Sequence, residues 1–116
     1  MRLKFQADAA FNHRAIVILG ERWPLIEAMP ASGRIAEATP DEEILAMAAD
    51  TGRVLLTHDV STMPRHFHRF IEQRDSPGVL LVHQLWPIRR MVEGIYVAWN
   101  RFSPDDMRNQ ILWRPQ

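Results

Sequence analysis

The sequence lacks cysteine altogether, and Lys4 is the single lysine among its 14 basic residues. Without cysteine the chain has no disulfide framework, no thiolate metal site and no cysteine nucleophile. No apolar run approaches the roughly 20 residues that span a bilayer. The first residues, MRLKFQAD, alternate polar with apolar side chains and do not form a signal-peptide core. We therefore expect a cytoplasmic protein without a membrane partner.

An excess of charge of one sign is also missing. The 14 acidic and 14 basic residues give a formal net charge of zero, which argues against a protein that coats nucleic acid through bulk electrostatics. Residues 1–60 hold 9 acidic and 6 basic side chains (net −3), whereas residues 61–116 hold 5 and 8 (net +3). Arginine supplies almost all of the positive charge, and its planar guanidinium suits phosphate and carboxylate alike. A genome that favours arginine codons explains the same bias.

The 116 residues, 47% hydrophobic and 24% charged, predict a single soluble domain spanning residues 1–116. Strand-like and helix-like segments alternate along the chain, which predicts an α/β fold, a three-layer α/β/α sandwich with a mostly parallel central sheet. We expect strands at 3–7, 24–29, 53–57, 78–83 and 109–113, and helices at 11–20, 39–52, 64–74 and 87–102.

Two helices carry recognisable end signals. In TPDEEILAMAADTG, Thr39 is expected to be the N-cap, with Pro40 at the first helical position and Glu42 completing a capping box. Gly52 stands where a left-handed C-cap is typical. Gly20 is expected to end the helix that begins near residue 11.

Two predicted strands end on an aspartate. Asp8 follows the first strand, and Asp59 follows the strand in RVLLTHD. In open parallel sheets, ligands bind outside the carboxyl ends of the strands, at the point where the winding reverses. If these strands are neighbours, the two carboxylates can share a cation, and hard oxygen ligands suit Mg²⁺ or Mn²⁺. Such a site predicts phosphodiester hydrolysis.

The blocks FQADAAFN, PDEEILAMAADTGRVLLTHDVSTMP and PGVLLV resemble the small PIN-like family related to the Mut7-C domain, over roughly residues 4–113. Members of that family look like compact PIN-fold ribonucleases that depend on a metal, and many are predicted toxins of toxin-antitoxin pairs. The resemblance implies catalytic roles for Asp8, Asp41 and Asp59, and metal binding by Asp8, Glu43 and Asp59. It also implies Mg²⁺ or Mn²⁺ as the cofactor, RNA and a cognate antitoxin protein as partners, and it allows a homodimer.

The chain departs from the family pattern at three positions. Ala9 and Ala10 stand where the family commonly has Glu and Asn, and Ser61 stands where it commonly has a second aspartate. Each lost carboxylate weakens Mg²⁺ binding. A PIN-like domain that has lost catalysis and binds RNA or a protein is therefore the alternative. A receiver-like regulatory domain is a third possibility, discounted because that class needs a later lysine and Lys4 is the only one.

Arginines supply the candidate contacts to nucleic acid. Arg65 and Arg69 are four residues apart on one predicted helix face, just after Asp59, and with Thr57 they form the predicted nucleic-acid-binding set. The alternatives are a solvated helix surface for the arginines and a hydrogen bond to an acid for Thr57. The wider set of candidate arginines consists of Arg74, Arg89 and Arg90.

The acidic residues and His58 also have simpler structural interpretations. Asp59 can cap the turn after its strand, as aspartate commonly does. Asp41, Glu42 and Glu43 can be ordinary residues of a helix start, where the dipole favours negative charge. His58 should point to the opposite face of the sheet from its neighbours, and so away from the acids.

Overall fold

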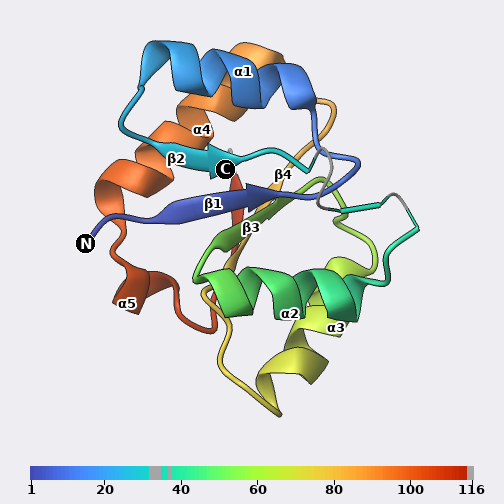
Figure 1. Cartoon of the computed structure of the whole chain (residues 1–116). Coiled ribbons are helices and arrows are strands. Elements are labelled where there is room, and N and C mark those ends of the chain that lie inside the picture. Colours follow the sequence, from blue (N-terminus) through green and yellow to red (C-terminus); the bar gives the residue numbers. More distant parts are fainter. Residues whose placement is uncertain (32–34, 37, 115–116) are drawn as a thin grey trace.

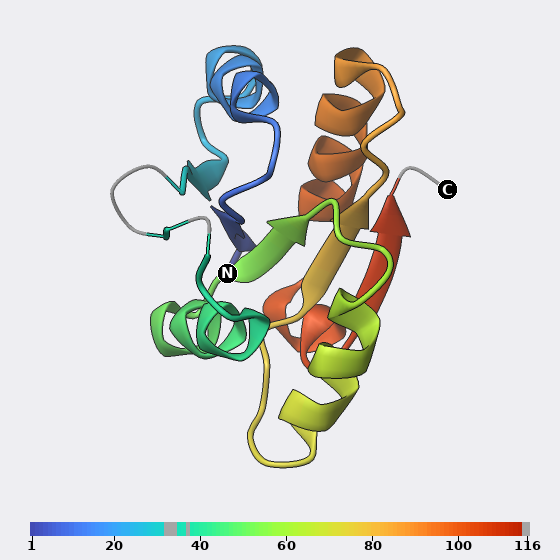
Figure 2. The same ribbon diagram turned by 90° about the vertical axis from the view of Figure 1, so that its right-hand side faces the viewer.

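A computed structural model describes residues 1–31, 35–36 and 38–114, and the predicted loop residues Ser32 and Gly33 lie outside them. A five-stranded, all-parallel sheet with strand order β2-β1-β3-β4-β5 lies between two helical layers (Figures 1 and 2). The three-layer α/β/α sandwich predicted from the sequence is therefore confirmed. The elements are β1 (Lys4–Ala7), α1 (His13–Arg22), β2 (Glu27–Met29), α2 (Asp41–Thr51), β3 (Val54–Thr57), α3 (Met63–Ile71), β4 (Val79–Val82), α4 (Ile88–Arg101), α5 (Pro104–Met107) and β5 (Ile111–Arg114).

The two central strands, β3 and β4, are buried along their whole length because helices cover both faces of the sheet. Successive side chains alternate between the two hydrophobic cores. One core lies under α1 and α4 and contains Leu56, Leu80 and Val82. The other lies under α2 and α3 and contains Leu55, Val79 and Leu81. Which core a strand residue faces therefore follows from its position in this alternation.

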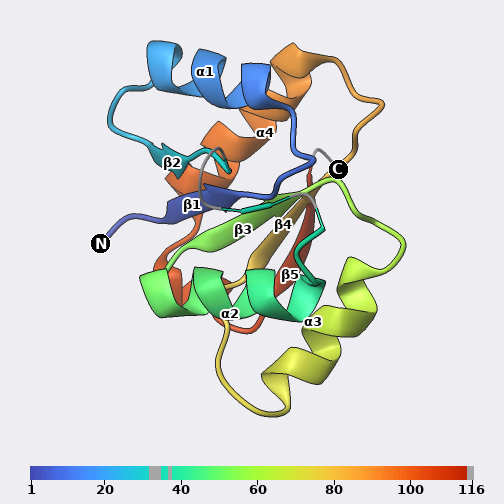
Figure 3. The same cartoon turned by 45° about the vertical axis from the view of Figure 1, so that its right-hand side comes forward.

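The winding of the sheet reverses between β1 and β3. From β1 the chain crosses to β2 on one side, and then passes through α2 to β3 on the other side of β1 (Figure 3). Phe5 pairs with Val54 and Ala7 with Leu56. The Asp8 amide donates to the Leu56 carbonyl at 2.9 Å, which extends this ladder one residue past β1. Ligands of open α/β sheets bind at such a reversal.

The start of α2 differs from the prediction. Thr39 is not the N-cap and Glu42 completes no capping box, because Pro40 holds the cap position and no side chain caps the helix. Pro40 has an extended backbone (φ −59°, ψ 145°), so the helix begins one residue later, at Asp41. The predicted C-cap is confirmed, since Gly52 is left-handed with φ 67°.

The end of α1 and the short helix α5 also differ from the prediction. Gly20 does not end α1, which continues to Arg22 and stops before Pro24, where the ring of proline excludes further helix. The short helix α5 was not predicted, although Ser103 and Asp106 form a capping box there with Pro104 between them. That signal was present in the sequence as SPDD.

Across the described ranges, no helix is both long and apolar enough to cross a membrane.

We predict that Gly78→Ala destabilises the fold by about 3 kcal/mol, as judged by chemical unfolding. Gly78 has φ +112°, and an added Cβ would overlap the Met107 carbonyl oxygen and lie 3.2 Å from that of Gln110. Gly20→Ala is the matched control, because nothing lies within 4 Å of the added Cβ. Alanine is the better helix former, so this substitution should raise the free energy of unfolding by about 0.5–1 kcal/mol. Equal effects of the two substitutions would contradict the close approach at Gly78.

Candidate functional site at the carboxyl edge

Asp8 and Thr57 meet where β1 and β3 end. Both side chains point to the α2 and α3 side of the sheet, because each lies two residues beyond a residue of that face. The Thr57 hydroxyl donates to Asp8 Oδ2 at 3.0 Å and accepts from the Asp59 amide at 3.1 Å. The Ala9 amide donates to Asp8 Oδ1 at 2.6 Å. The reversal point thus holds the Asp8 carboxylate in one orientation.

Asp59 caps the turn that leads into α3. Its Oδ1 accepts from the Ser61 amide at 3.1 Å and from the Thr62 amide at 2.9 Å, and its Oδ2 accepts from the Thr62 hydroxyl. Partial burial alone would raise the pKa of Asp59. The hydrogen bonds from Thr62, Ser61 and Met63 outweigh burial and hold that pKa below its ordinary value. The structural interpretation of Asp59 as a turn residue is therefore confirmed.

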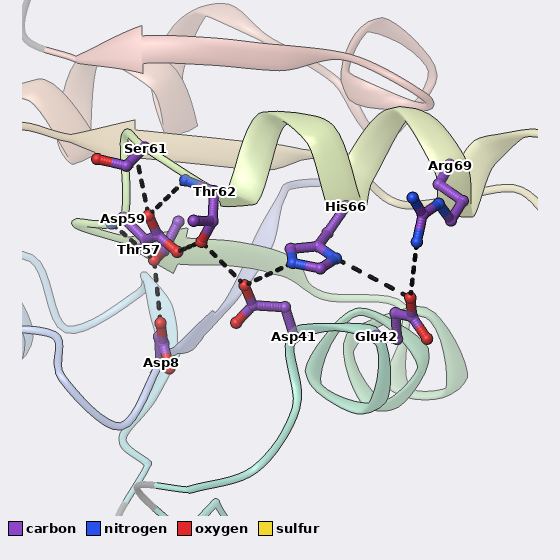
Figure 4. A network of polar contacts seen from close by, with 9 residues as sticks. All are labelled: Asp8, Asp41, Glu42, Thr57, Asp59, Ser61, Thr62, His66 and Arg69. Atoms are coloured by element: carbon purple, nitrogen blue, oxygen red, sulfur yellow. Dashed lines mark hydrogen bonds and ion pairs between the residues drawn. The ribbon is translucent and has the colours of Figure 1, made fainter.

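Asp41 reaches the same place from the start of α2 (Figure 4). Its Oδ2 lies 3.4 Å from the Thr62 hydroxyl and 3.7 Å from His66 Nε2 on α3. The hydroxyl has one hydrogen, so it donates to Asp41 or to Asp59 but not to both. Partial burial and then the charge of Asp59 raise the pKa of Asp41, with a smaller contribution from Asp8, while His66 opposes them. We call Asp8, Asp41 and Asp59 the carboxylate cluster.

A chain of contacts continues outward from Asp41 along the two helices. His66 Nδ1 lies 3.9 Å from Glu42 Oε1, and Arg69 Nη1 lies 3.7 Å from the same oxygen (Figure 4). Glu43 is exposed, and within the described residues no contact joins it to the cluster. The helix start thus contributes Asp41 to the cluster by direct contact, and the metal role of Glu43 stays a prediction.

The donor chemistry of the cluster fits a hard divalent cation, because it consists of carboxylate oxygens. The positions of these carboxylates fit a metal site less well than their chemistry does. Among the residues that the structure describes, no three His, Cys, Asp or Glu side chains converge as a group that could hold a metal. Each carboxylate oxygen can accept more than one hydrogen bond or ligand, so the bonds already made at Asp8 and Asp59 leave lone pairs for a cation.

The arginines separate into two groups. Arg65 is exposed on the first turn of α3, and Arg69 is 61% exposed beside Glu42. Arg89 and Arg90 lie in the first turn of α4, which follows β4 after residues 83–87, hence at the carboxyl edge. Arg74 instead pairs with Asp50 at 3.1 Å near the end of α2, at the opposite edge of the sheet. Arg74 therefore does not belong to the candidate site.

Thr57 does not fit its predicted contact with nucleic acid. Its exposed fraction is 0%, and its hydroxyl is engaged by Asp8 and the Asp59 amide. The alternative interpretation, a hydrogen bond to an acid, is the one that the structure supports. Thr57 positions Asp8 and Asp59, and its side chain is too buried to contact RNA.

His58 points away from the cluster, as strand alternation predicted. Its Nδ1 lies 2.6 Å from the Val82 carbonyl, and its Nε2 lies 3.2 Å from the Asn12 amide. These partners require a neutral ring that carries its hydrogen on Nδ1. The ring also stacks on Phe11 at 4.3 Å. His58 therefore joins the ends of β3 and β4 to the start of α1.

Two members of the site, Thr62 and His66, were not predicted. The spacing of Thr62 three residues after Asp59 is a usable signal, because aspartate commonly bonds the backbone of the turn that follows it. His66 carries no such signal, since its partners Asp41 and Glu42 lie more than 20 residues earlier in the chain.

A comparison with protein-family models, with curated proteins and with solved structures finds no match to this chain.

We predict that His58→Phe lowers the free energy of unfolding by about 2 kcal/mol. Phenylalanine can keep the stack on Phe11 but leaves the Val82 carbonyl and the Asn12 amide without their partner. Chemical unfolding measures the change. His68→Phe, at an exposed position of α3, is the control and should be near neutral. A His58→Phe protein as stable as the wild type would contradict the joining role of His58.

We predict that Thr62→Val raises the pKa of Asp59, because the hydroxyl bonds its ionised form. A folded pKa below the unfolded value gives stability that is present above the unfolded pKa, about 3.9, and is lost as the pH falls through the folded pKa. Thr62→Val should therefore cost about 1 kcal/mol at neutral pH and less in acid. NMR titration of the side-chain carboxyl carbon and unfolding at several pH values measure both quantities.

Thr62→Ser keeps the hydroxyl and is the matched control, with a pKa for Asp59 like that of the wild type. An unchanged Asp59 pKa in Thr62→Val would show that the backbone amides of the turn are sufficient to hold the carboxylate ionised.

Proposed function

We propose that this protein is a divalent-cation-dependent ribonuclease of PIN-like fold that hydrolyses RNA phosphodiester bonds at the carboxylate cluster, and that it is the toxin of a toxin-antitoxin pair. The observation that carries the proposal is the position of Asp8, Asp41 and Asp59 at the reversal point between β1 and β3. The toxin role and the antitoxin partner rest on the resemblance of the sequence blocks alone.

Electrostatics supports a cation at the cluster. The charges of Asp59 and Asp8 both disfavour ionised Asp41, whereas His66 and the hydrogen bond from the Thr62 hydroxyl oppose them. A divalent cation held by Asp8 and Asp59, with Glu43 as a further candidate ligand, would stabilise the negative charge on the reacting phosphate.

The remaining roles belong to the side chains around the cluster. Asp41 is assigned to accept the proton of the attacking water, because its Oδ2 has only distant partners, the Thr62 hydroxyl at 3.4 Å and His66 Nε2 at 3.7 Å. Thr57 and Thr62 fix the orientations of the carboxylates that they bond. Arg65 and Arg69 are exposed on α3, Arg69 beside Glu42, and would supply positive charge for RNA phosphates.

A domain that binds RNA or a protein without cleavage is the second candidate. It is favoured by the incomplete convergence of metal ligands within the described residues, and by the alanines at positions 9 and 10. Both candidates use the same edge of the sheet, and they differ in whether a cation binds there and whether RNA is cut.

We predict saturable binding of Mn²⁺ or Mg²⁺ to the wild-type protein, weakened at least about 10-fold in Asp8→Asn and in Asp59→Asn. Isothermal calorimetry measures the affinity, and cleavage of a fluorogenic single-stranded RNA measures activity, which should fall with it. Asp105→Asn is the matched control, because Asp105 is 91% exposed on α5 and far from the carboxyl edge. Its metal affinity and activity should equal those of the wild type.

Absence of metal binding at millimolar concentration together with absence of cleavage would overturn the nuclease. If RNA still bound, with an affinity that fell with salt and with removal of Arg65 and Arg69, the binding domain would replace it. Growth arrest on expression of the wild type but not of Asp59→Asn would be the result expected of a toxin.

A further inference from the structure

A pocket of about 190 Å³ opens beside the carboxylate cluster and has no part in the function proposed so far. Its walls come from the end of β1, the start of α1 and the segment after β2. Asp8 belongs both to the cluster and to this pocket. The described residues that line it include Asp8, Ala9, Phe11, His13, Ala31 and Ile35.

The wall formed by α1 is held in place by three contacts. Asn12 caps the helix through its side chain, which accepts from the Ala15 amide at 3.2 Å. The Asn12 amide donates to His58 Nε2, and the Phe11 ring stacks on the His58 ring at an interplanar angle of 11°. This wall is therefore formed before any ligand arrives.

Buried Gln6 holds the opposite wall. Its side-chain amide nitrogen lies 2.8 Å from the Ala7 carbonyl and 3.3 Å from the Met29 and Pro30 carbonyls, so its two hydrogens are shared among three acceptors where β2 ends. The Ile35 amide closes the same wall with a hydrogen bond of 2.9 Å to the Ala31 carbonyl. Because the wall at the start of α1 is already ordered, ligand binding costs less conformational entropy of the protein there.

Size and chemistry of the pocket indicate its ligand. It holds more than a few waters, each of which takes about 30 Å³, but it is smaller than the roughly 300–1,000 Å³ of pockets for drug-sized ligands. Most of its lining residues are apolar, but polar atoms form slightly more than half of the exposed wall, and Asp8 and His13 add groups that can hydrogen-bond the edge of a polar ring. These properties match a single flat heteroaromatic ring, which buries its faces and bonds through its edge.

We propose that this pocket holds the nucleobase next to the scissile phosphate, so that the protein selects its RNA cleavage site by one base. This proposal rests on the proposed function, since the phosphate of that nucleotide would lie over the carboxylate cluster. Asp8 lies at the boundary between pocket and cluster, which places the base and its phosphate on either side of one carboxylate. Ala31 and His13 would determine which base is accepted.

Titration with the four ribonucleosides tests the pocket without phosphate, metal or catalysis. We expect at least one nucleoside to cause saturable ¹H–¹⁵N NMR shifts at Ala9, Phe11 and His13. Ala31→Leu fills the pocket and should weaken this binding at least 10-fold. Ala36→Leu is the matched control, because Ala36 is exposed in the same segment and does not line the pocket.

His13→Ala is a second test variant, at an exposed position whose change should leave the fold intact, and it should weaken binding several-fold. Absence of saturable shifts with all four nucleosides at millimolar concentration, or equal binding by Ala31→Leu and wild type, would overturn the pocket. Nucleoside binding in a protein that cuts no RNA would sustain the pocket and reject the nuclease. Cleavage of RNA without any nucleoside binding would support the nuclease and reject the nucleobase pocket.

Discussion

The hydrogen bond from the Asp8 amide to the Leu56 carbonyl is the contact on which the candidate site depends. It extends the β1–β3 ladder past the end of β1, at the one place where the winding of the sheet reverses. Because the register is fixed there, Asp8 lies beside Thr57, and the Thr57 hydroxyl connects Asp8 to the Asp59 amide. A slip of one residue would turn these side chains to the opposite face.

Strand alternation then directs the side chains at the end of RVLLTHD to opposite faces of the sheet. Thr57 and Asp59 serve the α2 and α3 side, where the carboxylates gather, whereas His58 serves the α1 side by bonding the Val82 carbonyl and the Asn12 amide. The same three residues therefore fix both the acidic cluster and the start of α1, which is one wall of the adjacent pocket. The end of β3 therefore positions both the carboxylate cluster and one wall of the pocket.

Local patterns in the sequence were sufficient for the layers, the parallel strands and the common edge of Asp8 and Asp59, because each depends on periodicity or on the end of a strand. The start of α2 was wrong by a residue, since threonine before proline satisfied the capping pattern while the backbone of Pro40 stayed extended. The contacts of Asp41 with Thr62 and His66 depend on how two separate helices pack, and no local pattern encodes that packing.

The side chains of Ala9 and Ser61 take no part in orienting the carboxylates of the cluster. Asp8 is oriented by a backbone amide, that of Ala9, and by Thr57, so the side chain at position 9 is not needed for it. Asp59 likewise uses the Ser61 amide, which any residue at that position except proline would supply. Backbone amides and threonine hydroxyls thus orient Asp8 and Asp59, and no side chain at position 9 or 61 takes part. Ala9 also lines the pocket, where a small apolar side chain leaves the wall beside Asp8 uncharged. Alanine at position 9 therefore adds no carboxylate to the cluster and leaves the neighbouring pocket wall uncharged, so one residue bears on both the proposed cation site and the proposed base pocket.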